Sequence, residues 1–401
     1  MVMREALKPA PAPRRVTILG STGSVGRNTI DIISRDPAAY AVEALTAQDN
    51  SALLIEQARS VKPRFVAIGN EAHYRVVKEA LAATGTEVAA GRAAVIEAAA
   101  RPAEWVMSAI VGAAGLEPTL AAVRRGAVIG LANKETLVCA GAVVMREVAR
   151  CNAVMVPVDS EHSAIFQCLD QNNAEAVEKI ILTASGGPFR QKSLAEMAEM
   201  TPAQAVAHPN WSMGAKISVD SATMMNKGLE LIEAHHLFGL PETQIDILVH
   251  PQSVIHSMVA YRDGSVLAQL GSPDMRTPIA YALGWPKRIA APAERLDFGK
   301  IRQLSFEAPD EARFPALRIA RETLRAGGGA SSVLNAANEV AVAAFLRRQI
   351  RFTDIAAIAE HVLGELPGGP IERLDQILAL DAEARRRAAD AVAARRRNNN
   401  D

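Results

Sequence analysis

The first 158 residues alternate between short apolar runs and longer segments with helical periodicity. The apolar runs, rich in Val, Ile, Leu and Ala, cover residues 16–19, 42–45, 65–68, 105–110, 127–131 and 153–158. Between them, the clearest helical spacing is found over residues 50–59, 71–83 and 134–150. Strands that alternate with helices are typical of a parallel sheet with helices on both faces. Residues 1–158 are therefore predicted to form a doubly wound, Rossmann-like α/β domain.

Residues 159–285 have a different pattern. Strand-like runs occur at residues 180–183, 245–249 and 265–270, and the polar, Pro- and Gly-containing segments between them have the composition of binding loops. A helix is predicted after Ser221, and it ends where Gly239 terminates it and Pro241 forbids its continuation. The region is predicted to be an α+β domain.

The last part of the chain is predicted to be entirely helical. Residues 286–310 contain three prolines and form a connector, and from residue 311 to 401 only helices are expected, over residues 315–325, 330–347 and 353–363. Two arginine triplets, at residues 385–387 and 395–397, are expected at a solvated helix end, where cations complement the helix dipole. This gives a C-terminal helical bundle.

Composition narrows the choice of partners. The chain has 401 residues, of which 49% are apolar and 22% charged, and its net charge is zero. It therefore offers no strongly basic surface for nucleic acid or a membrane, and no stretch reaches the ~18 apolar residues that a membrane span needs. Cys139, Cys151 and Cys168 lack metal-ligand spacing and are expected to be reduced core thiols. We expect a bacterial-type cytoplasmic protein.

A glycine-rich segment with the spacing GxxGxxG, from Gly20 to Gly26, follows the first predicted strand and opens the next helix. Small residues there let the backbone approach a pyrophosphate, and free N–H groups at the helix N-terminus bind the anion. A tight strand-to-helix turn without a ligand is the alternative. The position inside a βαβ alternation favours a dinucleotide site. Residues 47–50, after the second strand, are where such folds meet the adenosine ribose.

Three carboxylates lie on two short segments. Asp159 and Glu161 follow the last apolar run of the first domain, and on an extended chain residues two apart point to the same side. Glu230 is on a predicted helix, one turn after Asn226 and three residues after Lys227. Carboxylate ligands suit a hard divalent ion such as Mg²⁺ or Mn²⁺ and disfavour Zn²⁺. Alternatively, Asp159 and Glu161 are solvated loop acids, and Glu230 only pairs with Lys227.

Several further motifs occur in a fixed order along the chain. Together with the glycine segment they are NKE at residues 133–135, VDSEH at 158–162, SGGPFR at 185–190, HPNWSMG at 208–214, SATMMNKGLE at 221–230, SPDMRTP at 272–278 and NAANE at 335–339. In this order and spacing, the chain closely resembles the 1-deoxy-D-xylulose 5-phosphate reductoisomerase family. The resemblance spans nearly the whole sequence.

The resemblance implies a reaction and an architecture. Members of this family convert 1-deoxy-D-xylulose 5-phosphate, a small phosphorylated sugar, to 2-C-methyl-D-erythritol 4-phosphate in the non-mevalonate isoprenoid pathway. They use NADPH and Mg²⁺, Mn²⁺ or Co²⁺, and they are typically homodimers. Their nucleotide-binding domain, catalytic and dimerisation domain and C-terminal helical bundle correspond here to residues 1–158, 159–285 and, after the connector 286–310, 311–401.

The resemblance also assigns roles to individual residues. The implied metal ligands are Asp159, Glu161 and Glu230. The implied catalytic residues are Lys134, Glu161 and His208. The implied substrate contacts are Lys134, Ser160, Glu161, Ser185, His208, Trp211, Ser221, Asn226, Lys227 and Glu230. Within this set, His208 and Trp211 belong to a mobile flap, and the implied phosphate pocket is Ser185, Ser221, Asn226 and Lys227. The expected cofactor contacts are Thr22, Gly23, Ser24, Val25, Gln48, Asp49, Asn50, Asn133, Glu135 and Gly214.

Position 49 departs from the family pattern. Family members often place a basic residue between the second strand and the next helix, facing the 2′-phosphate of NADPH, whereas this chain has Gln48 and Asp49. An acid in this position suits a ribose 2′-hydroxyl and repels a 2′-phosphate. We expect NADPH to remain the preferred cofactor, with Asp49 turned away from it.

Two other functions are compatible with parts of the pattern. A metal-independent nicotinamide dehydrogenase of the semialdehyde or homoserine type would share the first domain, but it would leave three convergent carboxylates beside a phosphate pocket unexplained. A redox-sensing nucleotide-binding protein, with a helical tail that engages a partner, would not be an enzyme. The metal dependence of NADPH oxidation separates the three functions. A reductoisomerase would require the metal absolutely, the dehydrogenase would oxidise NADPH without it, and the sensor would not oxidise NADPH at all.

Overall fold

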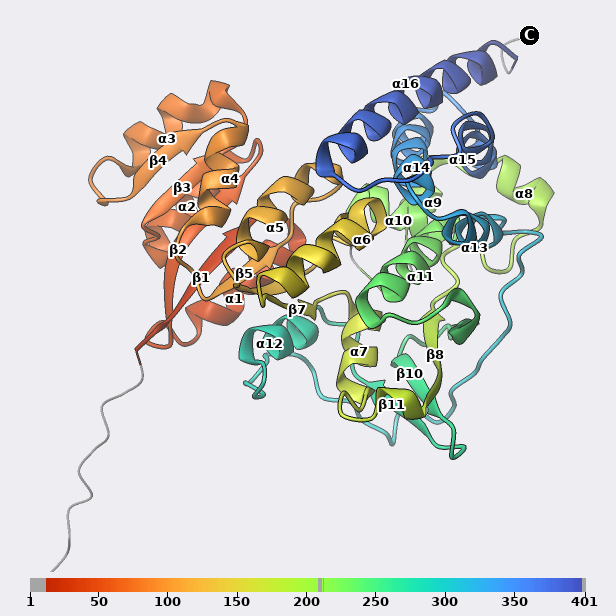
Figure 1. Cartoon of the computed structure of the whole chain (residues 1–401), viewed down its shortest axis with the longest axis horizontal. Helices are drawn as coiled ribbons and strands as arrows, with labels where there is room; N and C mark the ends of the chain where they lie inside the picture. Colours follow the sequence, from red (N-terminus) through yellow and green to blue (C-terminus); the bar gives the residue numbers. More distant parts are fainter. Residues whose placement is uncertain (1–11, 208–210, 212, 399–401) are drawn as a thin grey trace, which may run out of the picture.

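The computed structural model describes residues 12–207, 211 and 213–398, and within them the first domain is built on a parallel sheet of seven strands (Figure 1). The strand order is β4-β3-β2-β1-β5-β6-β7, and all neighbouring pairs are parallel. The strands are β1 Arg14–Leu19, β2 Tyr40–Ala47, β3 Phe65–Ile68, β4 Glu87–Ala90, β5 Trp105–Ser108, β6 Val128–Leu131 and β7 Val154–Pro157. The order reverses at β1, and this switch point is where doubly wound folds bind ligands. The predicted fold class is confirmed.

Helices cover both faces of this sheet. Most of its strands are therefore buried on both sides. The helices are α1 Ser24–Ser34, α2 Ser51–Val61, α3 Tyr74–Leu81, α4 Arg92–Ala100, α5 Leu116–Val123 and α6 Glu135–Arg150. The sequence does not predict the edge strand β4. Its four residues are at best half-buried, so it contains no strongly apolar run that a pattern search could detect.

A second, mixed sheet has the order β11-β10-β8-β9. β8 is parallel to β9 and antiparallel to β10, which in turn is antiparallel to β11. The strands are β8 Val177–Ala184, β9 Ile245–Val249, β10 Ile255–Tyr261 and β11 Val266–Leu270. The sequence does not predict β10, although all seven of its residues are buried. Burial on both faces removes the polar–apolar alternation, and His256 and Ser257 interrupt the apolar run.

Short and long helices surround the second sheet. They are α7 Ser160–Cys168, α8 Leu194–Ala198, α9 Pro202–Val206, α10 Ala215–Ala222 and α11 Met225–Phe238, and α12 Arg276–Gly284 follows the last strand of this sheet in the sequence. The predicted end of α11 is confirmed, because Gly239 adopts a left-handed conformation with φ of 67° and closes the helix.

One helix from this part of the chain packs on the first sheet. In α12, Ile279 and Leu283 belong to the apolar core on one face of that sheet. The carbonyl oxygen of Ala282 also accepts a hydrogen bond from Trp105 Nε1 at 3.1 Å. The chain thus returns to the first sheet before it enters the C-terminal region, and the division into domains at residues 158, 285 and 310 stays a prediction.

Up to residue 398, the C-terminal region contains four helices: α13 Ala316–Ala326, α14 Ala330–Leu346, α15 Asp354–Glu365 and α16 Leu374–Asn398. They share one apolar core with the second sheet. Figure 1 shows α16 crossing the molecule above α14. The prediction for the first arginine triplet is wrong, since Arg385 lies in the middle of α16 and pairs with Asp381 and Glu339. None of the helices in the described residues has the length and apolarity needed to cross a bilayer.

Gly228 lets α11 pack closely against α13. A Cβ atom added to Gly228 would lie 2.8 Å from the Cβ of Ala320 and 3.1 Å from the carbonyl oxygen of Ala316. Gly364 of α15 is a contrasting helix glycine, because an added Cβ there would have no neighbour within 4 Å among the described atoms.

Gly228→Ala is expected to lower the free energy of unfolding by about 1–3 kcal/mol, because the new methyl group overpacks the contact between two helices. Gly364→Ala, the matched control, should raise it by up to about 1 kcal/mol, because alanine favours the helix. Chemical denaturation measures both changes. Equal effects of the two substitutions would contradict this account of the α11–α13 contact.

Candidate active site

A cavity of about 180 Å³ lies where segments of the two sheets and of helices α1, α7, α10 and α11 meet. Part of its lining follows directly after β6, β7 and β8, at the carboxyl ends of these strands. Of the residues predicted from the sequence, those that line it are Ser24, Val25, Lys134, Asp159, Ser160, Glu161, Ser185, Trp211, Gly214, Ser221, Asn226, Lys227 and Glu230. The fold therefore gathers the predicted metal, substrate and part of the cofactor residues around one space.

Asp159 and Glu161 converge through a helix start. Asp159 is the N-cap of α7, and its Oδ1 accepts a hydrogen bond from the main-chain N–H of Glu161 at 3.2 Å. Glu161 is in the first turn of the same helix, where an acid is also favoured by the helix dipole. The predicted extended conformation is thus wrong, although the two side chains do line the same cavity. Ser160 Oγ donates to Glu161 Oε2 at 2.5 Å.

Two lysines bridge the three carboxylates. Lys134 Nζ lies 2.8 Å from Asp159 Oδ2 and 3.1 Å from Glu230 Oε1. Lys227 Nζ lies 3.0 Å from Glu161 Oε1 and also pairs with Glu230. Ligand oxygens of the three acids lie within 4.8 Å of one another. Asp159 and Glu161 are only 11% and 20% exposed, so they are not solvated loop acids.

The charges of this cluster leave room for a cation, because three carboxylates face two ammonium groups. Burial raises the pKa of Glu230, and the negative charges of Asp159 and Glu161 raise it further. Burial opposes the charged form of Lys134, but Asp159 and Glu230 hold its pKa well above the usual range. An all-oxygen donor set with mutual repulsion fits a hard divalent ion such as Mg²⁺ or Mn²⁺.

The predicted phosphate-binding residues lie beside this cluster. Ser185 follows β8, and the next residue, Gly186, has φ of 82°, a left-handed conformation that favours glycine. Asn226 is in the first turn of α11, and its Oδ1 accepts a hydrogen bond from Lys134 Nζ at 2.8 Å. Lys227 is directed to the carboxylates through its two ion pairs. It therefore links the carboxylate cluster to the other residues that are predicted to bind the phosphate.

The segment before α10 forms another wall of the cavity. Trp211, Met213 and Gly214 line it, and the ring centroid of Trp211 lies 6.1 Å from that of His256. Gly214 is the N-cap of α10. His208, predicted as a catalytic residue on the same segment, lies outside the described residues.

A second cavity, of about 780 Å³, lies at the carboxyl ends of β1, β2, β3 and β5. Gly20, Thr22, Gly23 and Gln48 line it. Gly20 has φ of +79°, and a Cβ there would lie 2.6 Å from the Ala109 carbonyl oxygen, so the turn requires glycine. Gly23 is the N-cap of α1 and offers no side-chain cap, which leaves main-chain N–H groups for an anion. This geometry fits a dinucleotide.

The acid that departs from the family pattern is held by a neighbouring loop. Asp49 Oδ1 accepts a hydrogen bond from Asn70 Nδ2 at 2.9 Å. Asn50 caps α2 by accepting from the N–H of Leu53 at 3.1 Å. In the described part of the chain, neither Asp49 nor Asn50 is among the residues that line the two cavities.

Asn133 and Glu135 also have structural partners. Asn133 donates to the carbonyl oxygen of Gly112 at 3.0 Å and accepts from the N–H of Thr136 at 2.7 Å. Glu135 is buried and pairs with Lys216 of α10 at 3.0 Å. Neither residue lines a cavity within the described ranges. Both side chains thus make contacts outside the two cavities, although they flank Lys134 in the sequence.

Sequence reasoning overlooks several residues of the smaller cavity. They are Asn28, Thr183, Ser253, His256 and Met275. Burial lowers the pKa of His256 to about 4, so its imidazole is neutral at pH 7. Its signal in the sequence is a polar residue inside a run of buried positions on β10, which can be detected only if that strand is recognised.

Comparison with known proteins agrees with this arrangement. The family model of 1-deoxy-D-xylulose 5-phosphate reductoisomerase matches residues 16–141. Two models of the C-terminal domain of this family match residues 155–238 and 270–387. The 1-deoxy-D-xylulose 5-phosphate reductoisomerase of Rhodospirillum centenum is 62% identical over 383 residues, which cover 96% of this chain and 95% of that relative. The chain belongs to the 1-deoxy-D-xylulose 5-phosphate reductoisomerase family. The Zymomonas mobilis member is 56% identical, over 94% of this chain and 97% of its own.

Solved structures of the family have the same fold. The Zymomonas mobilis enzyme in complex with NADPH superimposes with a TM-score of 0.90 at 54% identity, over 95% of this chain and 99% of that one. A reductoisomerase in complex with NADPH, fosmidomycin and magnesium also gives a TM-score of 0.90, at 43% identity, over 95% of this chain and 98% of that chain.

Glu230→Gln is expected to weaken Mn²⁺ binding by roughly tenfold or more, because it removes one anionic ligand from a hard-cation site. Isothermal titration calorimetry measures the change. Glu242→Gln is the control, since Glu242 pairs with Arg321 and Arg325 away from both cavities and should alter stability without altering Mn²⁺ affinity. A wild-type affinity in Glu230→Gln would remove this residue from the metal site.

Proposed function

We propose that this protein converts 1-deoxy-D-xylulose 5-phosphate to 2-C-methyl-D-erythritol 4-phosphate, with NADPH and a divalent metal. The observation that carries the proposal is that the two cavities share the glycine segment. Gly20, Thr22 and Gly23 line the larger one, whereas Ser24 and Val25 line the smaller one with its three carboxylates. A nicotinamide bound along this segment would reach the carboxylate cavity, as a reaction that combines metal-dependent rearrangement with reduction requires. Membership of the family supports the same reaction.

In this proposal Asp159, Glu161 and Glu230 hold Mg²⁺ or Mn²⁺, with Co²⁺ as a further candidate. A divalent ion held there would act as a Lewis acid, orienting the substrate through its oxygens and polarising the carbonyl group. Lys134, kept protonated by its carboxylate partners, donates hydrogen bonds to the same oxygens as negative charge develops on them. Ser160 adds a hydroxyl group next to Glu161.

Ser185, Ser221, Asn226 and Lys227 are proposed to bind the phosphate group. Hydroxyls, an amide and an ammonium group together supply charge-assisted hydrogen bonds to a dianion. Met224, the N-cap of α11, makes no side-chain hydrogen bond to the first turn. The N–H of Met225 there donates to Thr223 Oγ1 at 3.2 Å, and the other main-chain amides of the turn add partial positive charge. Phosphate binding fixes the distance from the sugar carbons to the carboxylates.

Trp211, Met213 and Gly214 are proposed to close over the substrate with His208. A large aromatic side chain on a segment that ends at a glycine can exclude water while a carbon–carbon bond is broken and re-formed. The NADPH that Thr22, Gly23, Ser24, Val25 and Gln48 would bind supplies the hydride that reduces the resulting aldehyde. We propose that Asn50, Asn133 and Glu135 shape this cofactor site from behind.

A metal-independent nicotinamide dehydrogenase is not favoured. Its chemistry needs no metal, so it would leave the three carboxylates and two lysines of the smaller cavity without a role. A nucleotide sensor without catalysis leaves the same cluster unexplained.

The proposed reaction is tested by NADPH oxidation in the presence of 1-deoxy-D-xylulose 5-phosphate. We expect turnover with Mg²⁺ or Mn²⁺, its loss after chelation with EDTA, and its recovery when the metal is restored. Substrate without a phosphate group is the control, and it should not support oxidation. Chelator-resistant oxidation would instead indicate the dehydrogenase.

Asp49→Lys is expected to tighten NADPH binding by roughly fivefold, because a like charge near the 2′-phosphate costs on the order of 1 kcal/mol at a screened surface site. NADH binding should not change. Asp49→Asn separates the loss of the acid from the gain of a cation. Fluorescence titration gives the affinities, and a wild-type enzyme with a higher kcat/KM for NADH would overturn the NADPH preference without affecting the reaction.

We also propose that the protein is a cytoplasmic homodimer, as the family resemblance implies. β11 is an edge strand of the second sheet, and Val266 and Leu267 on it are about half exposed. An exposed apolar edge strand is a ready surface for a second chain. Light scattering of the purified protein determines the oligomeric state.

A further inference from the structure

Glu233 is a buried carboxylate to which the proposed reaction assigns no role. It lies on α11, one turn after Glu230, and its side chain is only 1% exposed. Neither of its oxygens receives a hydrogen bond in the described part of the chain. A buried charge is costly unless a group of opposite sign compensates it. Its retention inside the protein therefore calls for a partner.

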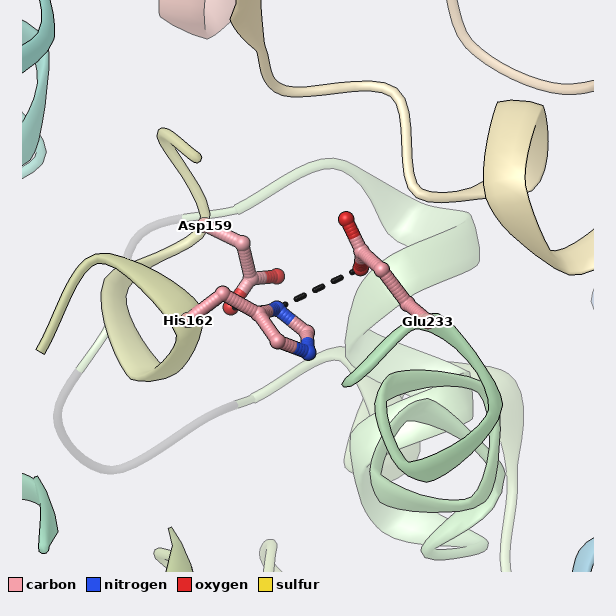
Figure 2. A group of neighbouring side chains, drawn as sticks. All are labelled: Asp159, His162 and Glu233. Atoms are coloured by element: carbon pink, nitrogen blue, oxygen red, sulfur yellow. Dashed lines mark ion pairs between the residues drawn. The ribbon is translucent and has the colours of Figure 1, made fainter. Parts of the chain in front are cut away.

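The partner is His162, one residue after the metal ligand Glu161. Its Nδ1 lies 3.3 Å from Glu233 Oε2 and 3.4 Å from Asp159 Oδ1. Figure 2 shows the imidazole of His162 between the two carboxylates, with Glu233 reaching across from α11. The other ring nitrogen, Nε2, lies 2.9 Å from the main-chain carbonyl oxygen of Glu230. Nε2 therefore donates to this carbonyl oxygen, whereas Nδ1 faces the two carboxylates at ion-pair distance.

We propose that Glu233, acting through His162, is a positioning residue for the metal ligands Asp159 and Glu230. Glu233 holds the imidazole in one orientation. The imidazole then directs the Asp159 carboxylate through Nδ1, and through Nε2 it ties the backbone of α11 at Glu230 to α7. Partners behind metal ligands commonly change metal affinity by about 10- to 100-fold. The inference rests on the metal site of the proposed function.

A second metal ion among Asp159, His162 and Glu233 is the competing explanation, because their ligand atoms also lie within 4.8 Å of one another. The stoichiometry of Mn²⁺ binding separates the two explanations, because a second site would bind a second ion. An ion pair of His162 with the two carboxylates needs no metal, and Nδ1 faces both of them at 3.3–3.4 Å. Asp159 is also shared with the first cluster, where it pairs with Lys134.

The test is a titration of the full-length protein with Mn²⁺, without substrate or NADPH. The electron paramagnetic resonance signal of free Mn²⁺ measures how much of the ion is bound. We expect one Mn²⁺ per chain in the wild type. Glu233→Gln should weaken its binding roughly tenfold or more, and His162→Phe should do so to a similar degree. The double variant should bind Mn²⁺ about as tightly as the single variant with the lower affinity, because Glu233 acts only through His162.

The cycle separates positioning from simple charge attraction. If Glu233→Gln loses the same factor with and without His162, the Glu233 charge acts directly on the metal, and the proposal is overturned. It is also overturned if Glu233→Gln binds Mn²⁺ like the wild type, or if the wild type binds two Mn²⁺ and this variant only one.

Two controls keep the result interpretable. Fluorescence titration with NADPH should give unchanged affinity, because neither Glu233 nor His162 lines the larger cavity. Glu242→Gln should leave Mn²⁺ affinity unchanged. If Glu233→Gln or His162→Phe does not fold, Glu233→Asp carries the test, since it keeps the charge but withdraws the carboxylate from His162. Wild-type Mn²⁺ affinity in Glu233→Asp then overturns the proposal. Loss of Mn²⁺ binding only in Glu233 variants, with Glu230→Gln unaffected, would instead refute the metal site of the proposed function.

Discussion

The buried cluster of Asp159, Glu161 and Glu230 with Lys134 and Lys227 is the interaction on which the rest of the structure depends. A charge removed from water must face an opposite charge at close range, or the folded state loses several kcal/mol. Each ammonium group here contacts carboxylates from two different parts of the chain. The N-terminal ends of α6 and α7 and the first turns of α11 therefore have to meet at one point. The unbalanced negative charge at that point is the reason to place a metal there.

The packing of α11 satisfies this constraint. A Cβ added to Gly141 of α6 would lie 2.1 Å from the ring of His236, and Gly228 similarly faces α13. Glycine at both contacts lets α11 lie close to its neighbours while Lys227 and Glu230 point into the cluster. The same helix carries Glu233 one turn after Glu230, so one helix positions both a residue of the cluster and a group behind it.

The larger cavity depends on parts of the chain that are far apart in sequence. Glu339 of α14 and Asp381 and Arg385 of α16 line it together with the glycine segment, and Arg385 pairs with both acids, at 2.6 and 2.7 Å. The C-terminal helices thus do more than cover the second sheet, since they complete a wall of the cavity in which the dinucleotide is proposed to bind. Two carboxylates and one guanidinium leave these three groups with a net negative charge. The main-chain amides of α1 are therefore left to bind the anion.

The sequence by itself determined the βα alternation of the first domain, the glycine turn, the end of α11 at Gly239 and the carboxylates of the site. These features are local, because strand runs, turn residues and motifs are written in consecutive positions. Only the tertiary structure decided that β10 runs through the second sheet, that Asp159 caps a helix, that Lys227 is directed to the carboxylates, and that Glu233 faces His162. The partner of a buried charge depends on which elements meet in space, and no local pattern contains that information.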